Sequence, residues 1–502
     1  MALRPLAKGD TISIGGRTVT VRDDIPPGHK MSIVDLGSDA PVRKFGWPIG
    51  LTTRVVAAGE HVHSHNLRCD HTIDLEAIAT EIPDAPPPVT GKSFQGYVRQ
   101  DGKVGTRNYL AIISSVNCSA SVSRMIAQKF DAASLKQYAN IDGVVAFRHD
   151  GGCAMAYEGM RHKMLSRTLG GIAKHPNIGG FLLVGLGCEQ GTLGHLIQSQ
   201  GLHQISIPGK NGSSATQAPV PTLSMQDVGG TAKTIELGVE IVSRLLPQVN
   251  EARRSTVDAS HLILGTNCGG SDGYSGITAN PVLGKASDIL VACGGTSVLA
   301  ETSEIYGAEQ LLTRRSRSAV VAHKLLERIE WWKWYCSVFG EELDNNPSVG
   351  NKAGGLTTIT EKSLGAVAKG GTTALEAVYE YSEPITSKGF VVMDTPGFDP
   401  ASVTGIVAGG CNIVAFTTGR GSCYGCKPVP SLKIASNSAL YNRMLGDMDF
   451  NAGEAVEGKS IDQLGEELFE QLLRTASGEK TKSELLNIGD DEFVPWTVGP
   501  VL

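Results

Sequence analysis

From residue 110 onwards, short apolar runs alternate with longer segments in which apolar and polar residues mix. The runs lie at 110–116, 144–147, 181–184, 262–264, 289–292, 390–393 and 413–416. Runs that are apolar throughout are typical of strands buried on both faces, and the longer segments between several of them favour helices. Buried strands that alternate with helices indicate parallel sheets. We therefore predict an α/β region built on parallel, Rossmann-like sheets.

The first 75 residues follow a different pattern. Glycine and proline turns separate short segments of alternating polarity, which lie at 11–14, 18–22, 31–35 and 53–56. Short alternating strands bounded by such turns are typical of antiparallel sheets. The pattern predicts a small all-β domain over residues 1–75.

Two changes in composition predict the remaining boundaries. Residues 81–90 contain four prolines, which favour an extended linker, and we place this linker at 76–95. A charged stretch at 251–254 precedes a new apolar run. We therefore predict a first α/β domain at 96–250 and a second, catalytic one at 251–502. Similar strand sequences at 109–118 and 261–268 indicate either two related α/β halves or a chance likeness.

Composition narrows the range of partners. The 502 residues include 45 basic and 51 acidic side chains, well mixed, so no basic stripe points to nucleic acid. The first residues lack an apolar signal core, and no run approaches the roughly 20 apolar residues of a membrane span. We expect a cytoplasmic protein with no membrane or nucleic-acid partner. Its ten cysteines are then expected to be thiols or metal ligands rather than disulfides.

Cysteine and histidine follow the predicted strands at the points where the strands end. Ligands of open α/β sheets bind at the carboxyl ends of the strands. Thiolate and imidazole suit iron or zinc, and three thiolates would also suit an iron–sulfur cluster with one open iron. Each cysteine alone could be a small buried apolar residue. As a group they predict a metal or iron–sulfur site made from Cys118, His149, Cys153, Cys188 and Cys268.

Charged residues in glycine-rich loops are the candidates for binding a carboxylate. Arg420 and Lys427 lie in the loop 417–427, where a guanidinium and backbone N–H groups could hold one, although a turn with solvated cations remains the alternative. Lys352 could serve as a base or an anchor, or be an exposed lysine. Asp394 follows a predicted strand and is an acid candidate, as are Glu301 and Glu304.

The small domain carries three histidines at alternate positions, His61, His63 and His65, which share one face in a strand. Imidazoles suit proton transfer near neutral pH and also bind metals, whereas a solvated edge is the plain alternative. Lys44 and Asn66 lie on the same domain and are candidates for binding substrate.

Long motifs in the chain resemble the altronate/galactarate dehydratase family. The likeness rests on segments at 105–120, 148–153, 185–189, 267–281, 294–309, 344–373, 393–400, 416–428 and 447–453. The first 75 residues resemble the SAF-type β-clip domain that precedes this region in the family, with HVHSHN at 61–66. The amino-acid sequence near the C-terminus resembles the altronate enzymes more than the galactarate enzymes.

This resemblance implies a hydro-lyase that acts on a sugar acid and uses iron(II), with manganese(II) or an iron–sulfur cluster as alternatives. The expected reaction is loss of water from D-altronate to give 2-keto-3-deoxy-D-gluconate. On this hypothesis the cysteine group with His149 holds the metal, whereas Lys44, Asn66, Arg420 and Lys427 bind substrate. The catalytic candidates are His63, His65, Lys352 and Asp394.

Other functions remain open. A galactarate dehydratase or another sugar-acid lyase would use similar motifs, and a non-catalytic protein that binds a sugar acid or a metal belongs to a different class. A nicotinamide oxidoreductase is disfavoured because no G-x-G-x-x-G fingerprint occurs. We expect a homo-oligomer, a dimer. The aromatic run at 331–335 would suit either its interface or the core.

Overall fold

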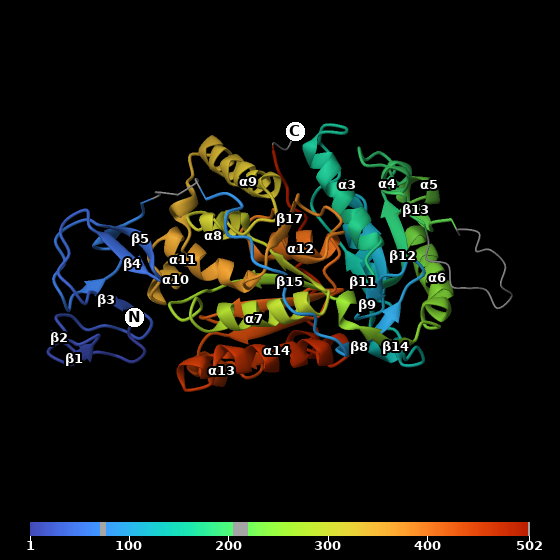
Figure 1. Cartoon of the computed structure of the whole chain (residues 1–502). Helices are drawn as coiled ribbons and strands as arrows, with labels where there is room; N and C mark the ends of the chain where they lie inside the picture. Colours follow the sequence, from blue (N-terminus) through green and yellow to red (C-terminus); the bar gives the residue numbers. More distant parts are fainter. Residues whose placement is uncertain (71–76, 204–218, 500–502) are drawn as a thin grey trace.

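The computed structural model describes residues 1–70, 77–203 and 219–499 (Figure 1). Its largest element is a parallel seven-stranded sheet. In spatial order the strands are β17 (Leu375–Tyr379), β18 (Gly389–Met393), β16 (Thr296–Leu299), β15 (Ile263–Cys268), β19 (Ile413–Thr418), β20 (Ser431–Ala435) and β21 (Phe450–Asn451). The predicted parallel α/β region is confirmed.

A second parallel sheet has four strands. Their order is β11 (Gly143–Phe147), β10 (Tyr109–Ser114), β12 (Ile178–Gly185) and β13 (Thr222–Ser224). The two similar strand sequences therefore fall on β10 and β15, and each of these strands pairs with a neighbour on both sides.

Apolar side chains of both sheets meet in a shared core. Helices α3 (Met160–Ala173) and α12 (Asp399–Ala408) contribute to it, together with β10, β12, β18 and β19. On its other side, the seven-stranded sheet packs against α7 (Ala279–Ala292) and α14 (Ile461–Ala476). Helices α1 (Asn117–Ala127) and α6 (Thr231–Val249) cover the outer face of the four-stranded sheet. Both sheets are thus covered on two faces, which explains their apolar runs.

The N-terminal region is all-β, as predicted. Its antiparallel pairs and ladders are small and lie at one end of the molecule (Figure 1). The strands are β1 (Thr11–Ile14), β2 (Arg17–Thr20), β3 (Lys30–Met31), β4 (Pro41–Lys44), β5 (Trp47–Thr52), β6 (His61–Val62) and β7 (Leu67–Arg68). The stretch at 53–56 is not a strand, so that prediction is wrong; it follows β5, and only Val56 makes an isolated bridge, to Leu36.

One predicted strand of the α/β region is also wrong. Residues 289–292 form the last turn of α7, and the strand comes later, as β16. The error has a physical reason, because a short apolar run fits a buried strand and the buried side of a helix equally well. Helix α7 ends at Ala292 with Cys293 as its C-cap, and Gly294 takes the left-handed φ of 78° that lets the chain turn into β16.

Residues 77–92 run along the α/β region without forming a helix or strand. Backbone N–H groups of Ala79, Glu81 and Val89 donate to carbonyls of the α/β region. Beyond this stretch, β8 (Ser93–Val98) pairs antiparallel with β9 (Val104–Gly105) and β14 (Arg254–Asp258). The remaining helices are α2 (Ala132–Leu135), α4 (Leu193–Gln200), α5 (Met225–Val228), α8 (Gln310–Thr313), α9 (Ala319–Val338), α10 (Val349–Ala353), α11 (Ile359–Ala366), α13 (Ser438–Arg443) and α15 (Lys482–Leu485).

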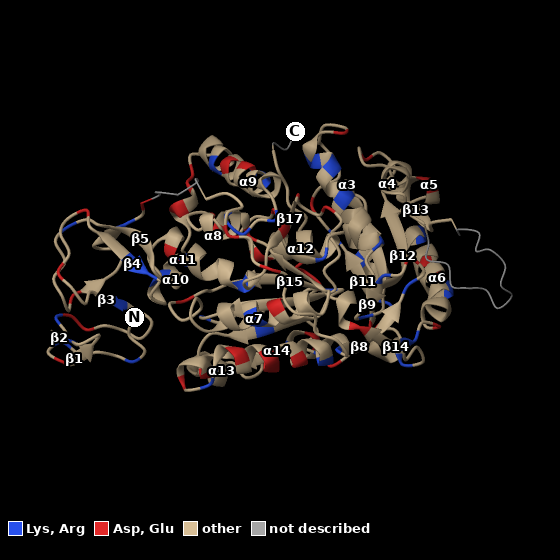
Figure 2. Ribbon diagram, in the orientation of Figure 1, with Lys and Arg blue, Asp and Glu red and all other residues tan. Residues whose placement is uncertain are grey.

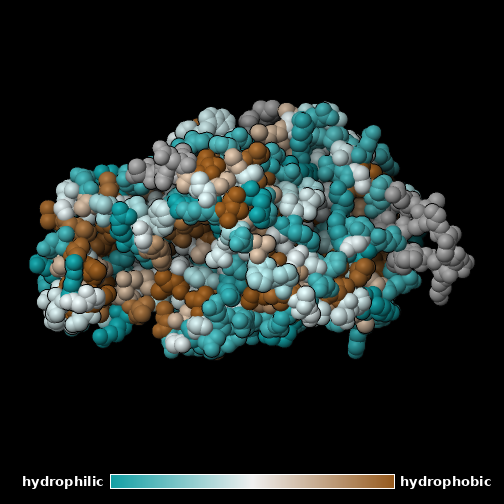
Figure 3. Space-filling view, in the orientation of Figure 1, coloured by the Kyte–Doolittle hydropathy of each residue, from teal (hydrophilic) through white to brown (hydrophobic). Residues whose placement is uncertain are grey.

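The aromatic run of α9 packs within the chain. Trp332 stacks on Trp496 at 4.9 Å between ring centroids, and Trp331 stacks on Tyr335 at 4.8 Å. Trp334 is exposed. On the face seen in Figure 3, hydrophobic residues form small groups among hydrophilic ones. Figure 2 shows basic and acidic residues mixed over the elements. No helix within the described ranges is long and apolar enough to cross a membrane.

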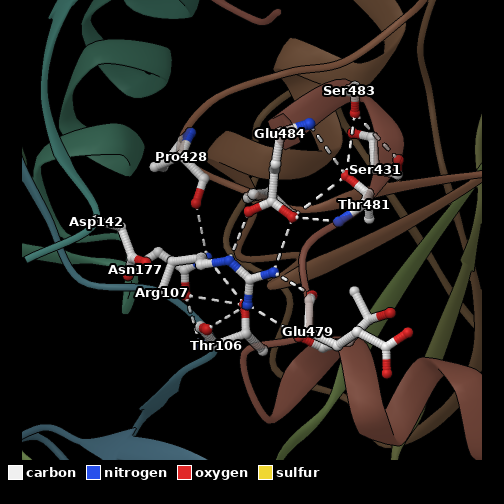
Figure 4. A network of polar contacts seen from close by, with 12 residues as sticks. Thr106, Arg107, Asp142, Asn177, Pro428, Ser431, Glu479, Thr481, Ser483 and Glu484 are labelled. Atoms are coloured by element: carbon white, nitrogen blue, oxygen red, sulfur yellow. Dashed lines mark hydrogen bonds and ion pairs between the residues drawn. The ribbon is translucent and has the colours of Figure 1, made fainter. Parts of the chain in front are cut away.

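A buried arginine ties the four-stranded sheet to the C-terminal segment (Figure 4). Arg107, two residues before β10, is fully buried and forms a two-pronged ion pair with Glu484 of α15, at 2.6 and 2.9 Å. Its remaining N–H groups donate to the carbonyl oxygens of Thr106, Thr475 and Glu479. All five donors of the guanidinium are therefore satisfied by groups of the chain.

Replacing Arg107 by Met is expected to lower the free energy of unfolding by about 3 kcal/mol or more, because Glu484 keeps a buried charge without its partner. Urea unfolding followed by circular dichroism measures the change. The control is Lys459→Met, which removes an exposed cation paired with Glu454 and Glu467 and is expected to cost below about 1 kcal/mol. Equal midpoints for the two variants would contradict the proposed role of Arg107.

Candidate active site

A cluster of buried ionisable side chains lies at the carboxyl edge of the seven-stranded sheet. Cys268 is the last residue of β15, Glu301 follows β16, and Glu304 closes the short 3-10 helix Thr302–Glu304. Lys362 comes from α11 and Lys369 from the 3-10 helix Val367–Gly370. Each of the five side chains is at most 7% exposed. Burying a charged side chain costs free energy unless the charge is paired. The positive and negative side chains of the cluster must therefore pair with one another.

The pairing is close and specific. Lys369 Nζ lies 2.8 Å from Cys268 Sγ and 2.9 Å from Glu301 Oε2. Lys362 Nζ donates to Glu304 Oε1 at 2.6 Å. The thiol of Cys268 donates to Glu304 Oε2 at 3.2 Å, and its backbone N–H donates to Glu301 Oε2 at 2.9 Å. One carboxylate oxygen of the cluster, Glu301 Oε1, has no hydrogen-bond partner in the described structure.

The electrostatics of this cluster shift its pKa values in opposite directions. Burial, reinforced by Glu301 and Glu304, raises the pKa of the Cys268 thiol well above its usual value. Burial and Glu304 likewise raise the pKa of Glu301. Burial alone would lower the pKa of Lys369, but Cys268 and Glu301 beside it raise it. The lysine therefore stays charged, and the thiol is the group most easily left protonated.

The backbone at Glu301 is strained. Its φ is +67°, a left-handed conformation that side chains with a Cβ rarely adopt. Its N–H donates to Thr395 Oγ1 at 2.7 Å, which helps to hold this conformation. Non-glycine residues in such conformations cluster at functional sites, where the surrounding structure enforces them. The strain at Glu301 therefore favours a functional role for this carboxylate.

Asp399, at the start of α12, extends the cluster. Asn267 Nδ2 donates to its carboxylate at 3.3 Å, and a Cβ on Gly269 would come within 2.4 Å of the other oxygen. Only glycine therefore fits at position 269. Burial, together with Glu301 and Glu304, raises the pKa of Asp399 to about 8. A carboxyl group of this kind is protonated near neutral pH and can act as a general acid.

Helix α11 also contacts the β domain. Glu361, adjacent to Lys362, accepts from Lys30 Nζ at 2.8 Å and from Lys44 Nζ at 2.9 Å. Lys30 Nζ also donates to the carbonyl of Gly355 at 2.6 Å. The crevice beside these groups encloses only about 10 Å³, so the β domain packs directly on the α/β region. One helix thus faces the β domain with Glu361 and the buried cluster with Lys362.

Replacing Glu361 by Gln is expected to destabilise the protein by about 3 kcal/mol at neutral pH, because two largely buried lysines lose their counter-ion. The pKa of Glu361 is depressed: burial raises it, but the two lysines lower it further. A depressed carboxyl contributes stability above the ordinary pKa of about 4.3, and this stability is lost as pH falls. The difference in urea midpoint between wild type and Glu361→Gln should therefore shrink below about pH 4.

The matched control for this experiment is Glu60→Gln, which removes an exposed pair with Arg54. It is expected to change the midpoint little at any pH. A midpoint difference for Glu361→Gln that grew on acidification would contradict the assigned ion pair.

Four imidazoles of the β domain lie at or near helix α10, which carries Lys352. The rings of His29, His61 and His63 lie 5.0–5.3 Å apart, and His65 is 5.5 Å from His61. His63 Nε2 is 2.9 Å from the carbonyl oxygen of Lys352, and His29 Nε2 is 3.2 Å from that of Ala353. Burial and the neighbouring imidazoles lower the pKa of His61 to about 4. Burial also lowers the pKa values of His29 and His63.

The other predicted substrate and catalytic residues are dispersed. Lys44 binds Glu361, and Asn66 is buried, where it holds the turn from His61 to His63. Lys427 pairs with Asp490, and Arg420 is exposed. Lys352 is half-buried, and its side chain makes no hydrogen bond or ion pair with the described residues. Asp394 is buried, and a single oxygen of its carboxylate accepts from both Thr302 and Trp332.

The five predicted metal ligands fall in two places. Cys118, Cys153 and Cys188 lie at the ends of β10, β11 and β12, whereas Cys268 belongs to the buried cluster at the end of β15. His149 is beside the first group, but both of its ring nitrogens are engaged: Nδ1 accepts from the N–H of Gly151, and Nε2 is 2.9 Å from the carbonyl oxygen of Ser114. This geometry leaves the imidazole no free lone pair for a metal.

A different set of donors meets the requirement of a single ion. In the part of the chain that the structure describes, three metal-binding atoms lie within 4.8 Å of one another at Cys268, Glu301 and Glu304. Glu301 and Glu304 were named from the sequence as acid candidates. Lys362, Lys369, Asp399 and Glu361 were missed. The signal for the two lysines was present, because they lie seven residues apart in a segment otherwise rich in small and apolar residues.

Comparison with known proteins matches three regions of the chain to domains of one enzyme family. The altronate/galactarate dehydratase SAF domain matches residues 1–70. The second domain of D-galactarate dehydratase/altronate hydrolase matches 96–250, and the D-galactarate/altronate dehydratase C-terminal domain matches 259–501.

Individual relatives extend over nearly the full length. Altronate dehydratase from Escherichia coli (strain K12) is 36% identical over 488 residues, which are 96% of this chain and 94% of that protein. Altronate dehydratase from Bacillus subtilis (strain 168) is 34% identical over 486 residues, with the same coverage. Galactarate dehydratase (L-threo-forming) from Escherichia coli (strain K12) is 36% identical over 462 residues, 91% of this chain and 87% of that protein. The chain belongs to the D-galactarate/altronate dehydratase family.

Proposed function

We propose that this protein is a hydro-lyase that removes water from the hexonate D-altronate to give 2-keto-3-deoxy-D-gluconate. Altronate dehydratases of two bacteria match 96% of the chain, which supports this substrate. The single observation that carries the chemistry is the buried cluster of Cys268, Glu301, Glu304, Lys362 and Lys369 at the sheet edge where ligands of α/β proteins bind.

The reaction needs a base, an acid and a positive environment. Breaking the C2–H bond next to the substrate carboxylate places a second negative charge on the same group, and the hydroxyl on C3 then leaves as water. The enol that results tautomerises to the keto acid. Lys362 and Lys369 supply buried positive charge at the cluster. In a site shielded from water, such charge stabilises a developing anion more strongly than in solution.

The donor set at the cluster fits a divalent iron, with manganese as the alternative. A thiolate and two carboxylates suit these metals, and Glu301 Oε1 is a buried oxygen with no partner among the described groups. Cys268, Glu301 and Glu304 would hold the ion, with loss of the thiol proton. When bound, it supplies Lewis-acid stabilisation of the charge that forms on the substrate.

The proton-transfer roles are divided between two parts of the site. Asp399, protonated near neutral pH, would give its proton to the departing C3 hydroxyl. Burial lowers the pKa values of His29, His61 and His63, so these imidazoles of the β domain are neutral and would supply the bases. His63 is held by the Lys352 carbonyl through Nε2, so its Nδ1 keeps the lone pair, within 3.0 Å of Ser64 Oγ. Arg420 and Lys352 would hold the substrate carboxylate, as proposed from the sequence.

The test is to purify the protein without oxygen, load it with iron(II), and assay altronate beside galactarate for the keto-deoxy acid. Turnover of altronate supports the proposal, and turnover of galactarate alone would overturn the substrate. Tight binding of either acid without product would place the protein in the class of non-catalytic binders. Folded, iron-loaded protein that neither binds nor converts either acid would overturn the function.

A further inference from the structure

Three exposed cysteines lie at the carboxyl edge of the other, four-stranded sheet. Cys118 is in the first turn of α1 after β10, Cys153 is in the loop after β11, and Cys188 is in the loop after β12. These three strands are neighbours, in the order β11-β10-β12. Cys268, Cys293 and Cys411, in contrast, are buried. Parallel strands thus deliver three accessible thiols to one edge, where sites of α/β sheets form.

Cys153 interacts electrostatically with the other two thiols. Cys118 and Cys188 both lie within electrostatic range of Cys153. Cys188 Sγ is 3.6 Å from the side-chain nitrogen of Gln226. Each of the outer thiols is therefore close enough to Cys153 for their charges to interact.

The loops that carry these thiols hold a fixed shape. Gly152 has a φ of +101°, and a Cβ there would come within 2.6 Å of the carbonyl oxygen of Ser115. Gly187 has a φ of +124°, and a Cβ there would meet Gln226 at 2.6 Å. Both glycines immediately precede a cysteine. Cys118 also lies at the positive end of α1, which favours a negatively charged ligand sphere.

The spacing of the sulfurs argues against a single ion. Thiolates that share one tetrahedral zinc lie only about 3.8 Å apart, given a Zn–S distance of about 2.3 Å. Among the described residues, the group of three donors that meets a limit of 4.8 Å is the one at Cys268, and the three exposed cysteines do not. A cluster of several irons spreads its thiolates more widely. His149 cannot complete a tetrahedral site, because both its nitrogens are engaged by the backbone.

We propose that Cys118, Cys153 and Cys188 bind an iron–sulfur cluster through three thiolates, which leaves one iron without a protein thiolate. This site is separate from the cluster at Cys268 and does not rest on the proposed dehydration. A buried imidazole lies close to the loop that carries Cys188. His162 is 1% exposed, its Nε2 has no hydrogen-bond partner in the described structure, and Gly191 of the Cys188 loop lies against it.

The test measures iron and acid-labile sulfide per chain, with visible absorption and electron paramagnetic resonance, in protein purified anaerobically and reconstituted with iron(II) and sulfide. The variants are Cys118→Ser, Cys153→Ser and Cys188→Ser. The matched control is Cys423→Ser, another exposed cysteine. We expect the wild type and the control to carry sulfide and the cluster absorption, and each of the three variants to lose both. Circular dichroism checks that the variants are folded, which we expect because the side chains are exposed.

Two further outcomes are decisive. Sulfide-free wild-type protein would overturn the proposal, whether the thiols hold zinc, a single iron or a disulfide. Retention of sulfide and absorption by all three variants would overturn it as well. Cys268→Ser separates the two sites, because it should leave acid-labile sulfide unchanged. If Cys268→Ser lost hexonate turnover but kept the iron–sulfur cluster, the result would bear on the proposed function and not on the proposed iron–sulfur site.

Discussion

Replacing Glu301 by Gln is expected to lower the turnover number for the hexonate by about 10³-fold, the loss typical of removing one preorganised charged contact from a buried site. Gln keeps the shape of the side chain but removes the charge that Lys369 and the Cys268 backbone N–H now contact. It also removes the oxygen that has no partner in the described structure, so the affinity for the divalent metal should fall with turnover.

Two measurements separate these effects. Keto-deoxy acid formation gives the turnover number, and metal analysis after dialysis gives the loaded fraction. Glu376→Gln is the control, because Glu376 is a partly exposed carboxylate paired with Arg317, and it should keep both values. Lys369→Met removes a positive charge from the same cluster and is expected to lower the turnover number as well. Wild-type turnover and metal content in Glu301→Gln would exclude the cluster as the reaction centre.

The strands of the α/β region were predictable because burial on both faces leaves a continuous apolar run, as in β10, β12 and β19. The sequence pattern predicted the location of strand β16 less well. Strand β16 is only four residues long and follows the apolar end of α7, so the run at 289–292 was assigned to a strand one element too early. Local pattern gives apolar character but does not distinguish the end of a buried helix from a short buried strand.

The site was harder to predict than the fold for a related reason. Cysteines at strand ends are conspicuous, and the structure does bring Cys118, Cys153 and Cys188 to one edge. The lysines of the buried cluster come from helical segments roughly 100 residues further along, and nothing local says that they fold back onto β15. Burial of Lys362 and Lys369 also depends on their partners Glu304 and Glu301, which only the tertiary structure brings to them. The predicted domain boundaries remain predictions.

Replacing Asp399 by Asn is expected to lower the turnover number by about 10²–10⁴-fold, the range for removing a general acid. Asn can still accept the hydrogen bond from Asn267, so the local geometry should persist. The wild-type turnover number should fall as pH rises through the pKa of Asp399, which is about 8 without a bound metal, because only the protonated carboxyl can deliver a proton. The residual activity of Asp399→Asn should lack this alkaline limb. A bound divalent ion lowers this pKa, so both profiles are recorded at equal metal loading.

The control for this last experiment is Asp227→Asn, an exposed carboxylate on α5, which should keep both the rate and the alkaline limb. If Asp399→Asn lost activity but kept the limb, the titrating acid would be another group, and Asp399 would act only by positioning Asn267 and the β15 edge. If the limb vanished together with most of the rate, the proton given to the departing hydroxyl would come from Asp399. Its high pKa in the metal-free protein follows first from burial of the carboxyl group and then from the charges of Glu301 and Glu304 beside it.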